Sequence, residues 1–338
     1  MPESEKKNIF YIIDKNAPDY QRIKEYDKHI IQFMSIRHMI YVMAMKVCIA
    51  TDSTPHLYLW RTKPSIIRKN IKKRRKELFL QHGVTALKQV HSIFGAKSAS
   101  PMRYYVTTSK NEHDIIVSEF EYAPEDVPIV GFCRWDVLED KSSETDKFIL
   151  LMPTWRSWLE EVDDSIFVDS DYYKNYSALL TDERLAEKLQ KSGTRLVLYL
   201  HPKFAEYTDT FKDKVSENIS YVPFGERSLN ELLMESHMLI TDYSSVCWDE
   251  LYQNKPVLFY QFDYERYNLA HGSYINMEKD LPGDRARDLD TLVDYIGEYI
   301  DNGLTIKPEH EAMARGWFAY RDHSNSKRTF DFLKSQGL

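Results

Sequence analysis

One stretch of the chain has the clearest pattern of secondary structure, Ser236-His-Met-Leu-Ile-Thr-Asp-Tyr-Ser-Ser-Val-Cys-Trp-Asp-Glu-Leu-Tyr-Gln-Asn-Lys-Pro-Val-Leu-Phe-Tyr260. An apolar run that ends at Thr241 predicts a strand, and the residues from about Tyr243 predict a helix. A second apolar run follows Pro256 and predicts another strand. A strand, a helix and a strand in such close order form a βαβ unit, which implies parallel strands joined by a crossover.

The same alternation extends in both directions from this unit. A helix is predicted over residues 111–120, and further strands are predicted over residues 8–13, 46–50, 77–81, 103–107, 129–132, 148–152, 195–200 and 219–222. Strands that alternate with helical segments favour an α/β fold with parallel sheets. Residues 138–147 are polar and lack an apolar period, so they predict a linker between two domains, over residues 1–140 and 146–338.

Length and composition are those of a globular protein. The chain has 338 residues, 43% of them hydrophobic and 29% charged, which excludes a disordered chain. Its longest apolar stretch, residues 39–50, is interrupted by Lys46 and is well short of the roughly 18 residues that a spanning helix requires. The charged N-terminus lacks the apolar core of a secretory signal, so we expect a cytoplasmic location. Cys48, Cys133 and Cys247 are scattered, which favours neither disulfides nor a zinc site.

The charge is unevenly distributed along the chain. The net charge is −7, yet residues 61–76 carry nine Lys or Arg and no acid. A basic run in an acidic protein is typical of a surface for anionic lipid, nucleic acid or a polyphosphate chain. The alternative is a solvated face without a partner. We single out Lys72, Lys73, Arg74 and Arg75 as candidate contacts.

Polar clusters follow four of the predicted strands, at Gln81-His-Gly83, Pro153-Thr-Trp-Arg156, His201-Pro-Lys203 and Asp242-Tyr-Ser-Ser245. In open parallel sheets, ligands bind beyond the carboxyl ends of the strands. We therefore expect these clusters to face a common cleft.

The cluster after Thr241 predicts an anion site. Asp242 is a reasonable N-cap, and the first-turn N–H groups with the hydroxyls of Ser244 and Ser245 would bind a phosphate. Asp249 lies four residues after Ser245, hence on the same helix face, where a carboxylate would bind a hydroxyl of the ligand. The alternative is an ordinary capped helix with a surface aspartate.

Two further strand ends present a histidine and an arginine. Pro202 stops the strand before it, so His201 stands fixed at the strand end and faces the cleft. Arg156 can chelate a phosphate in a bidentate way that a lysine cannot.

His82 is the candidate general base. It stands at a predicted strand end, and Gly83 beside it permits a close approach of backbone or substrate. An ordinary imidazole pKa near 6.5 suits removal of a proton from a hydroxyl at neutral pH. The alternative is a capping or core histidine.

Taken in order, these motifs resemble the CDP-glycerol glycerophosphotransferase family of teichoic-acid and capsule polymerases. The resemblance rests on the four clusters above together with Thr241, Gly131-Phe-Cys-Arg-Trp-Asp136, Pro256-Val-Leu-Phe-Tyr260 and Tyr320-Arg-Asp-His-Ser-Asn-Ser-Lys-Arg328. It implies a GT-B-like fold, with two facing Rossmann-type domains and an active site in the cleft between them.

The resemblance also implies a reaction. Glycerol phosphate passes from CDP-glycerol to the terminal hydroxyl of a polyol-phosphate or glycan acceptor, and CMP is released. His82 is then the base, and His201 steadies the pyrophosphate. The donor site comprises Arg156, Thr241, Asp242, Ser244, Ser245 and Asp249, of which Asp249 contacts the glycerol.

The partners follow from the same resemblance. We expect no metal and no other cofactor, because cationic side chains and a helix dipole neutralise the leaving group. The acceptor would be an anionic, lipid-linked polymer met at the inner face of the cell membrane, and no nucleic acid is expected. Longer members carry an extra N-terminal region, so here the basic run or a partner would provide membrane attachment.

Three alternatives remain open from the sequence. The donor could be CDP-ribitol, since nothing distinguishes a three-carbon from a five-carbon polyol. The chain could be a nucleotide-sugar glycosyltransferase of the same fold. It could also be an inactive scaffold that binds an anionic polymer through residues 61–76, although the presence of both histidines with Arg156 argues against this.

Overall fold

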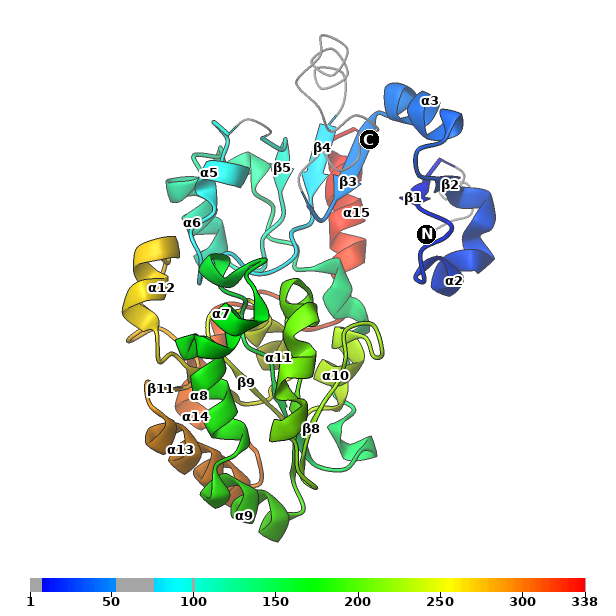
Figure 1. The fold of residues 1–338 in the computed structure, drawn as a ribbon. Coiled ribbons are helices and arrows are strands. Elements are labelled where there is room, and N and C mark those ends of the chain that lie inside the picture. The colour runs from blue at the N-terminus through cyan, green and yellow to red at the C-terminus, as the bar shows by residue number, and fades with distance from the viewer. Residues whose placement is uncertain (1–7, 53–75, 99–100, 338) are drawn as a thin grey trace.

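The computed structural model describes residues 8–52, 76–98 and 101–337 (Figure 1). The predicted contacts Lys72, Lys73, Arg74 and Arg75 lie outside these residues. No helix in the described parts of the chain is long and apolar enough to cross a membrane.

The larger sheet has six parallel strands in the order β11-β10-β9-β6-β7-β8. They are β6 (Phe148–Leu151), β7 (Arg195–Leu198), β8 (Ile219–Tyr221), β9 (Met238–Thr241), β10 (Val257–Tyr260) and β11 (Asp284–Ala286). Every residue of β6, β9 and β10 is buried, as expected for a parallel sheet covered on both faces. The strand order reverses between β6 and β9, so ligands are expected at their carboxyl ends.

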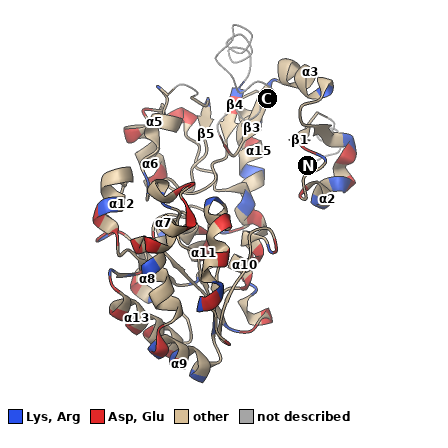
Figure 2. Cartoon of the chain, viewed as in Figure 1, with Lys and Arg blue, Asp and Glu red and all other residues tan. Residues whose placement is uncertain are grey.

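Helices cover both faces of this sheet (Figure 1). One face packs on α8 (Asp171–Leu180), α9 (Glu183–Ser192) and α13 (Leu289–Asp301), and the other on α10 (Leu229–Glu235), α11 (Cys247–Tyr252) and α14 (Pro308–Arg315). The helices α7 (Asp164–Asp169) and α12 (Tyr264–His271) lie near the carboxyl ends of the strands. Basic and acidic residues are interspersed on outer helices such as α8 and α9 (Figure 2).

A smaller parallel sheet forms the first unit. Its strands are β3 (Val47–Ala50), β4 (Lys76–Phe79) and β5 (Tyr104–Tyr105), accompanied by α5 (His91–Phe94) and α6 (Lys110–Glu119). The strand predicted over residues 129–132 is reduced to a single bridge between Ile129 and Thr107. Before this sheet come β1 (Tyr11–Ile13), α2 (Tyr20–Ile23), β2 (Ile30–Gln32) and α3 (Ile36–Ala44), which lie to one side of the molecule (Figure 1).

The last helix, α15 (Asn325–Ser335), returns to the first unit. Both carboxylate oxygens of Asp136 accept its first backbone N–H groups, from Asn325 at 2.8 Å and Ser326 at 2.7 Å. The ring of Phe332 packs edge-on against Tyr104 of β5, at 5.1 Å between centroids. The predicted domain boundary at residues 140–146 stays a prediction. Helix α15 follows this boundary in the chain, yet it packs with the first sheet.

Candidate functional site

The loop after β4 and the turn after β9 touch each other. A Cβ atom placed on Gly83 would lie 2.1 Å from Ser245 Oγ and 2.7 Å from Ser245 Cβ, closer than any side chain allows. Glycine therefore lets these two segments meet, as its position beside His82 predicted. The contact brings a strand end of the smaller sheet against a strand end of the larger one.

His82 stands at this contact with an exposed side chain. Its Nδ1 lies 3.3 Å from the carbonyl oxygen of Thr51. A hydrogen bond donated by Nδ1–H to that carbonyl leaves Nε2 as the basic nitrogen. The imidazole also lies near the rings of Phe79 and Phe94, at 6.4 and 6.1 Å between centroids. His82 is thus an exposed imidazole at the contact between the two units.

The chain after His82 crosses to the larger unit and docks beside α12. The carbonyl oxygen of Ala86 accepts from Tyr274 N at 2.9 Å and from Ser273 Oγ at 3.0 Å. In return, the hydroxyl oxygen of Tyr274 accepts from the backbone N–H of Val90 at 2.8 Å. Because Lys88 lies between Ala86 and Val90, these hydrogen bonds hold it beside the larger unit.

Lys88 joins a cationic cluster around Trp155. The Nζ atoms of Lys88 and Lys203 lie 5.3 and 3.9 Å from the centre of the Trp155 ring, close enough for cation–π attraction. The ring of His201 lies 6.1 Å from Trp155. Lys203 also forms an ion pair with Glu160. The segments after β4, β6 and β7 thus meet at one place.

Burial and mutual repulsion perturb this cluster. Burial, followed by the charges of Lys203 and Lys88, lowers the pKa of His201 to about 4. Burial and the charge of Lys203 likewise lower the pKa of Lys88. Cations crowded in this way attract an anion, because its charge would relieve the repulsion.

A second histidine, His271, extends the cluster. Its Nε2 lies 3.4 Å from Ser157 Oγ, and its ring stacks on Trp158 at 6.3 Å. Burial, followed by the charges of Lys88 and Arg156, lowers its pKa to about 4. Sequence reasoning missed His271 and Lys88. The available signal was the place of His271 at the end of a helical pattern, just before Gly272.

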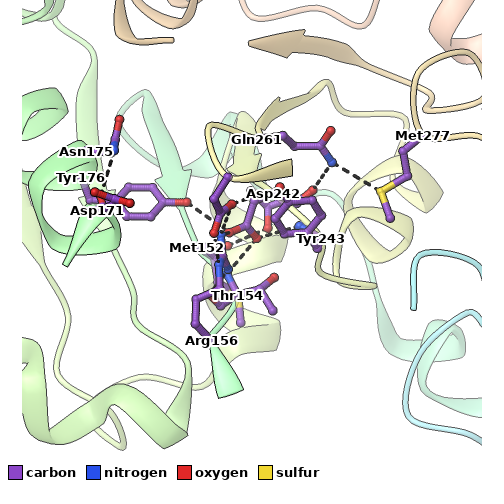
Figure 3. A network of polar contacts seen from close by, with 12 residues as sticks. Met152, Thr154, Arg156, Asp171, Asn175, Tyr176, Asp242, Tyr243, Gln261 and Met277 are labelled. Carbon is purple, nitrogen blue, oxygen red and sulfur yellow. Dashed lines mark hydrogen bonds and ion pairs between the residues drawn. The ribbon is translucent and has the colours of Figure 1, made fainter. Parts of the chain in front are cut away.

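Arg156 is fully buried and bonded to protein oxygens, so its expected role is corrected. Its side chain is 0% exposed, and its nitrogens donate to protein oxygens (Figure 3). Nε donates to Asp263 at 2.7 Å, and the two terminal nitrogens donate to Asp242 at 2.8 Å and to the carbonyl oxygen of Thr154 at 2.6 Å. A guanidinium occupied in this way cannot chelate a donor phosphate, and its role is to hold the loops together.

Asp242 and Thr241 are also structural. Asp242 is 0% exposed and accepts from the backbone N–H groups of Thr154 at 2.8 Å and Tyr243 at 2.7 Å (Figure 3). Thr241 Oγ1 donates to the carbonyl oxygen of Met152 at 2.7 Å. Contrary to prediction, Asp242 caps no helix, because α11 begins only at Cys247 and has no side-chain cap. Residues 242–246 form a turn instead.

Ser244 and Ser245 lie in the turn after β9, and their expected role in donor binding stays a prediction. Both are partly exposed in the turn that Asp242 and Arg156 hold. Ser244 Oγ accepts from Val246 N at 3.3 Å. Both serines therefore stay partly accessible, although the helix start predicted to support them lies farther along the chain.

Asp249 belongs to a contact between the two units. Its carboxylate accepts from Arg134 Nε at 2.9 Å and from Trp135 Nε1 at 2.7 Å, and the side chain is almost fully buried. Ser245 precedes α11, so the two residues do not share a helix face as predicted. The expected contact of Asp249 with the glycerol is therefore corrected, because its oxygens already bond to the protein.

Comparisons with known proteins give a family for this arrangement. A model of the family described as CDP-Glycerol:Poly(glycerophosphate) glycerophosphotransferase matches residues 2–335. The chain is 32% identical over 342 residues to the minor teichoic acid biosynthesis protein GgaB of Bacillus subtilis, covering 96% of this chain and 36% of GgaB. It is 24% identical over 290 residues to the teichoic acid ribitol-phosphate polymerase TarL of Staphylococcus aureus, covering 78% and 49%. The chain thus spans between a third and a half of these relatives.

The fold has a similar counterpart among solved structures. The wall teichoic acid polymerase TagF superposes with a TM-score of 0.67 at 16% identity, covering 98% of this chain and 92% of that one. At this identity the likeness shows the fold alone. The expected α/β, GT-B-like fold is confirmed.

Proposed function

Because the chain belongs to the CDP-glycerol:poly(glycerophosphate) glycerophosphotransferase family, we propose that it transfers glycerol phosphate from CDP-glycerol to a terminal hydroxyl of a teichoic-acid-type polymer. The observation that carries this proposal is the cluster of Lys88, His201 and Lys203 beside Trp155. The residues of this cluster and of the contact between Gly83 and Ser245 all come from segments that follow strands of the two parallel sheets. Two lysines for a diphosphate donor and an exposed histidine for a hydroxyl acceptor suit this reaction.

The reaction follows from these positions. Nε2 of His82 takes the proton of the acceptor hydroxyl, and the oxygen attacks the phosphorus that carries the glycerol. The bond from that phosphorus to the bridging oxygen breaks, and its electron pair leaves with CMP. Lys88, Lys203 and His201 stabilise the charge that develops on the leaving phosphate, while the hydroxyls of Ser244 and Ser245 orient the donor.

A CMP-release assay tests the proposal. We expect release from CDP-glycerol that depends on a polymer primer and falls by at least about 10²-fold in His82→Ala. Donor affinity of this variant, measured by calorimetry, should be nearly unchanged, because the base acts on the acceptor. Parallel assays with CDP-ribitol and a UDP-sugar distinguish the alternative donors. Of these two, CDP-ribitol has more support, because the relative TarL is named a ribitol-phosphate polymerase. Release from none of these donors would contradict the proposal.

We further propose that transfer needs no metal ion. Within the described parts of the chain, no group of three or more His, Cys, Asp or Glu could hold one. Lys88 and Lys203 would neutralise the leaving group, so CMP release should persist in excess EDTA. Complete loss in EDTA with rescue by magnesium would refute this part of the proposal.

The acceptor is proposed to be lipid-linked and met at the inner face of the cell membrane. The support is the basic run over residues 61–76, with nine Lys or Arg and no acid. Each such residue near an anionic surface contributes about 1 kcal/mol. Replacing Lys72, Lys73, Arg74 and Arg75 by Ser should therefore weaken co-sedimentation with anionic vesicles, as should added salt. Unchanged co-sedimentation would mean that the run is a solvated face.

A further inference from the structure

A carboxylate is buried in the first unit, close to His82. Glu112, in the first turn of α6, is 0% exposed. Its Oε1 accepts from the backbone N–H of Thr85 at 2.7 Å and from Gln81 Nε2 at 3.0 Å. Its Oε2 accepts from Thr108 N at 2.7 Å and Thr108 Oγ1 at 2.9 Å. These four donors are neutral groups, and together they fill the acceptor sites of a carboxylate.

Two of these partners stand on either side of His82. Gln81 precedes it with a φ of 61°, a left-handed backbone that is uncommon for any residue but glycine. The Gln81 amide is held firmly, because Nε2 donates also to the carbonyl oxygen of Val106 and Oε1 accepts from Thr85 Oγ1 at 2.8 Å. The backbone on both sides of the imidazole is therefore tied to one carboxylate.

The far side of this loop meets the other unit. Gly83 lies between His82 and Thr85 and abuts Ser245. Hydrogen bonds thus connect Glu112 to Gln81 and Thr85, which flank His82 and Gly83. Gly83 in turn contacts Ser245 in the serine turn. A misplacement of about 1 Å at a reacting group lowers rates by about 10²-fold, so the anchor of this loop has consequences for catalysis.

We propose that Glu112 is a positioning residue for the transfer: it sets the place of His82 against the Ser244–Ser245 turn without touching either substrate. The inference rests on the proposed function, because it assigns Glu112 an effect that passes through the base. A carboxylate suits the position since all four partners donate. An amide would turn its own N–H₂ group toward two of these donors.

The first test is Glu112→Gln. We expect kcat for CMP release to fall about 10- to 100-fold while the Kd for CDP-glycerol stays unchanged. The matched control is Ile116→Ala, one turn later on α6 and equally buried. It should lower the Tm at least as much but keep kcat, because it leaves the bonds of the loop in place. Equal losses of kcat in both variants would show that Glu112 serves only stability.

A double variant distinguishes this role from a general one. If Glu112 acts through His82, Glu112→Gln adds no further loss of kcat to His82→Ala. Losses of kcat that multiply would overturn the proposal.

A second variant covers the case in which Glu112→Gln does not fold. Gln81→Met removes one of the same hydrogen bonds and should lower kcat in the same way. A wild-type kcat in Gln81→Met would also overturn the proposal. If His82→Ala keeps its activity, His82 is not the base and the proposed function is contradicted. If His82→Ala is inactive but Glu112→Gln has a normal kcat, only the inference about Glu112 is contradicted.

Discussion

At the scale of single residues, burial separates side chains that look alike in the sequence. Arg156 and His201 both follow strands of the larger sheet, after β6 and β7. Arg156 lies beneath the loops and bonds to Asp242 and Asp263, whereas His201 is only partly buried and lies near Lys88 and Lys203, of which Lys203 pairs with Glu160. The first therefore holds the site together, and the second is free to respond to a ligand.

The buried arginine should matter for stability. Replacing Arg156 by Met leaves Asp242 and Asp263 without their cation, and removing one partner of a buried pair costs about 3–5 kcal/mol. Urea unfolding would measure this loss. Arg184→Met is the control, since Arg184 also pairs with two aspartates but at the surface, where such pairs contribute little. Similar losses in both variants would contradict the structural role of Arg156.

His201 should couple donor binding to protons. Its pKa is about 4 in the free protein because of burial, Lys203 and Lys88, and a bound diphosphate adds negative charge that raises it. The complex then holds more protons than the free protein, so affinity for CDP-glycerol should rise as the pH falls from about 6.5 toward 4.

Calorimetry in buffers of different ionisation heat measures this uptake directly. When CDP-glycerol binds at pH 5.5, the protein should take up as much as about one proton per affected histidine. The His201→Gln variant should take up fewer protons than the wild type. At pH 8 the uptake should vanish. Binding heats that do not depend on the buffer at pH 5.5 would mean that the diphosphate lies away from His201.

The sequence predicted the residues at strand ends but not their partners. His82 and Gly83 could be placed because local rules govern a strand end and a close approach. Arg156 and Asp249 were misread because their partners Asp263 and Arg134 lie 107 and 115 residues away. Lys88 reaches the site only because its loop docks beside Tyr274, a tertiary contact without a local signal.

At the scale of elements, two short segments without regular structure bring the units together. The turn of residues 242–246 and the loop after β4 meet where Gly83 abuts Ser245. The expected helix would have placed the serines on a rigid first turn. The observed turn instead depends on Arg156 and Asp242 for its shape.

Gly83→Ala should push these elements apart. The added Cβ would lie 2.1 Å from Ser245 Oγ, so we expect kcat to fall at least about 10-fold. The added methyl group should cost much less in a Ser245→Gly background, where the obstructing side chain is gone. Comparing CMP release by the wild type, the two single variants and the double variant tests this, and equal effects of Gly83→Ala in both backgrounds would contradict a steric cause.

Strands were predictable where burial is complete. The apolar runs of β6, β9 and β10 stand out because both faces of the sheet are covered. Residues 129–132 form only one bridge, because Gly131 has a left-handed φ of 77° that interrupts the extended backbone. The polar segment of residues 138–147 is not a free linker, because Lys141 N and Thr145 Oγ1 donate to the carbonyl oxygens of Met234 and Glu235.

At the scale of the molecule, two motifs of the resemblance, residues 131–136 and 320–328, join the units. The Gly131–Asp136 segment contacts α11 through Asp249 and contacts α15 through Asn325. Its Trp135 is fully buried and stacks on Tyr252 at 4.5 Å. One continuous core therefore runs through both units.

Asp249→Ala should weaken this junction. Arg134 and Trp135 Nε1 would lose their acceptor, at a cost of about 1–3 kcal/mol. A cycle with Arg134→Met should give a coupling free energy of about 0.5–3 kcal/mol in urea unfolding. Additive effects would mean that the two side chains act independently.

The return of α15 to the first sheet has a consequence for protein synthesis. The hydrogen-bond partner of Asp136 on α15, Asn325, lies 189 residues further along the chain. At about 5–20 residues per second, that partner leaves the ribosome roughly 10 to 40 s later. During this interval Tyr104 lacks the ring of Phe332 that packs against it in the folded protein. A nascent chain paused between the two segments should therefore bind chaperones that recognise exposed apolar surface, and should release them once residues 325–335 emerge.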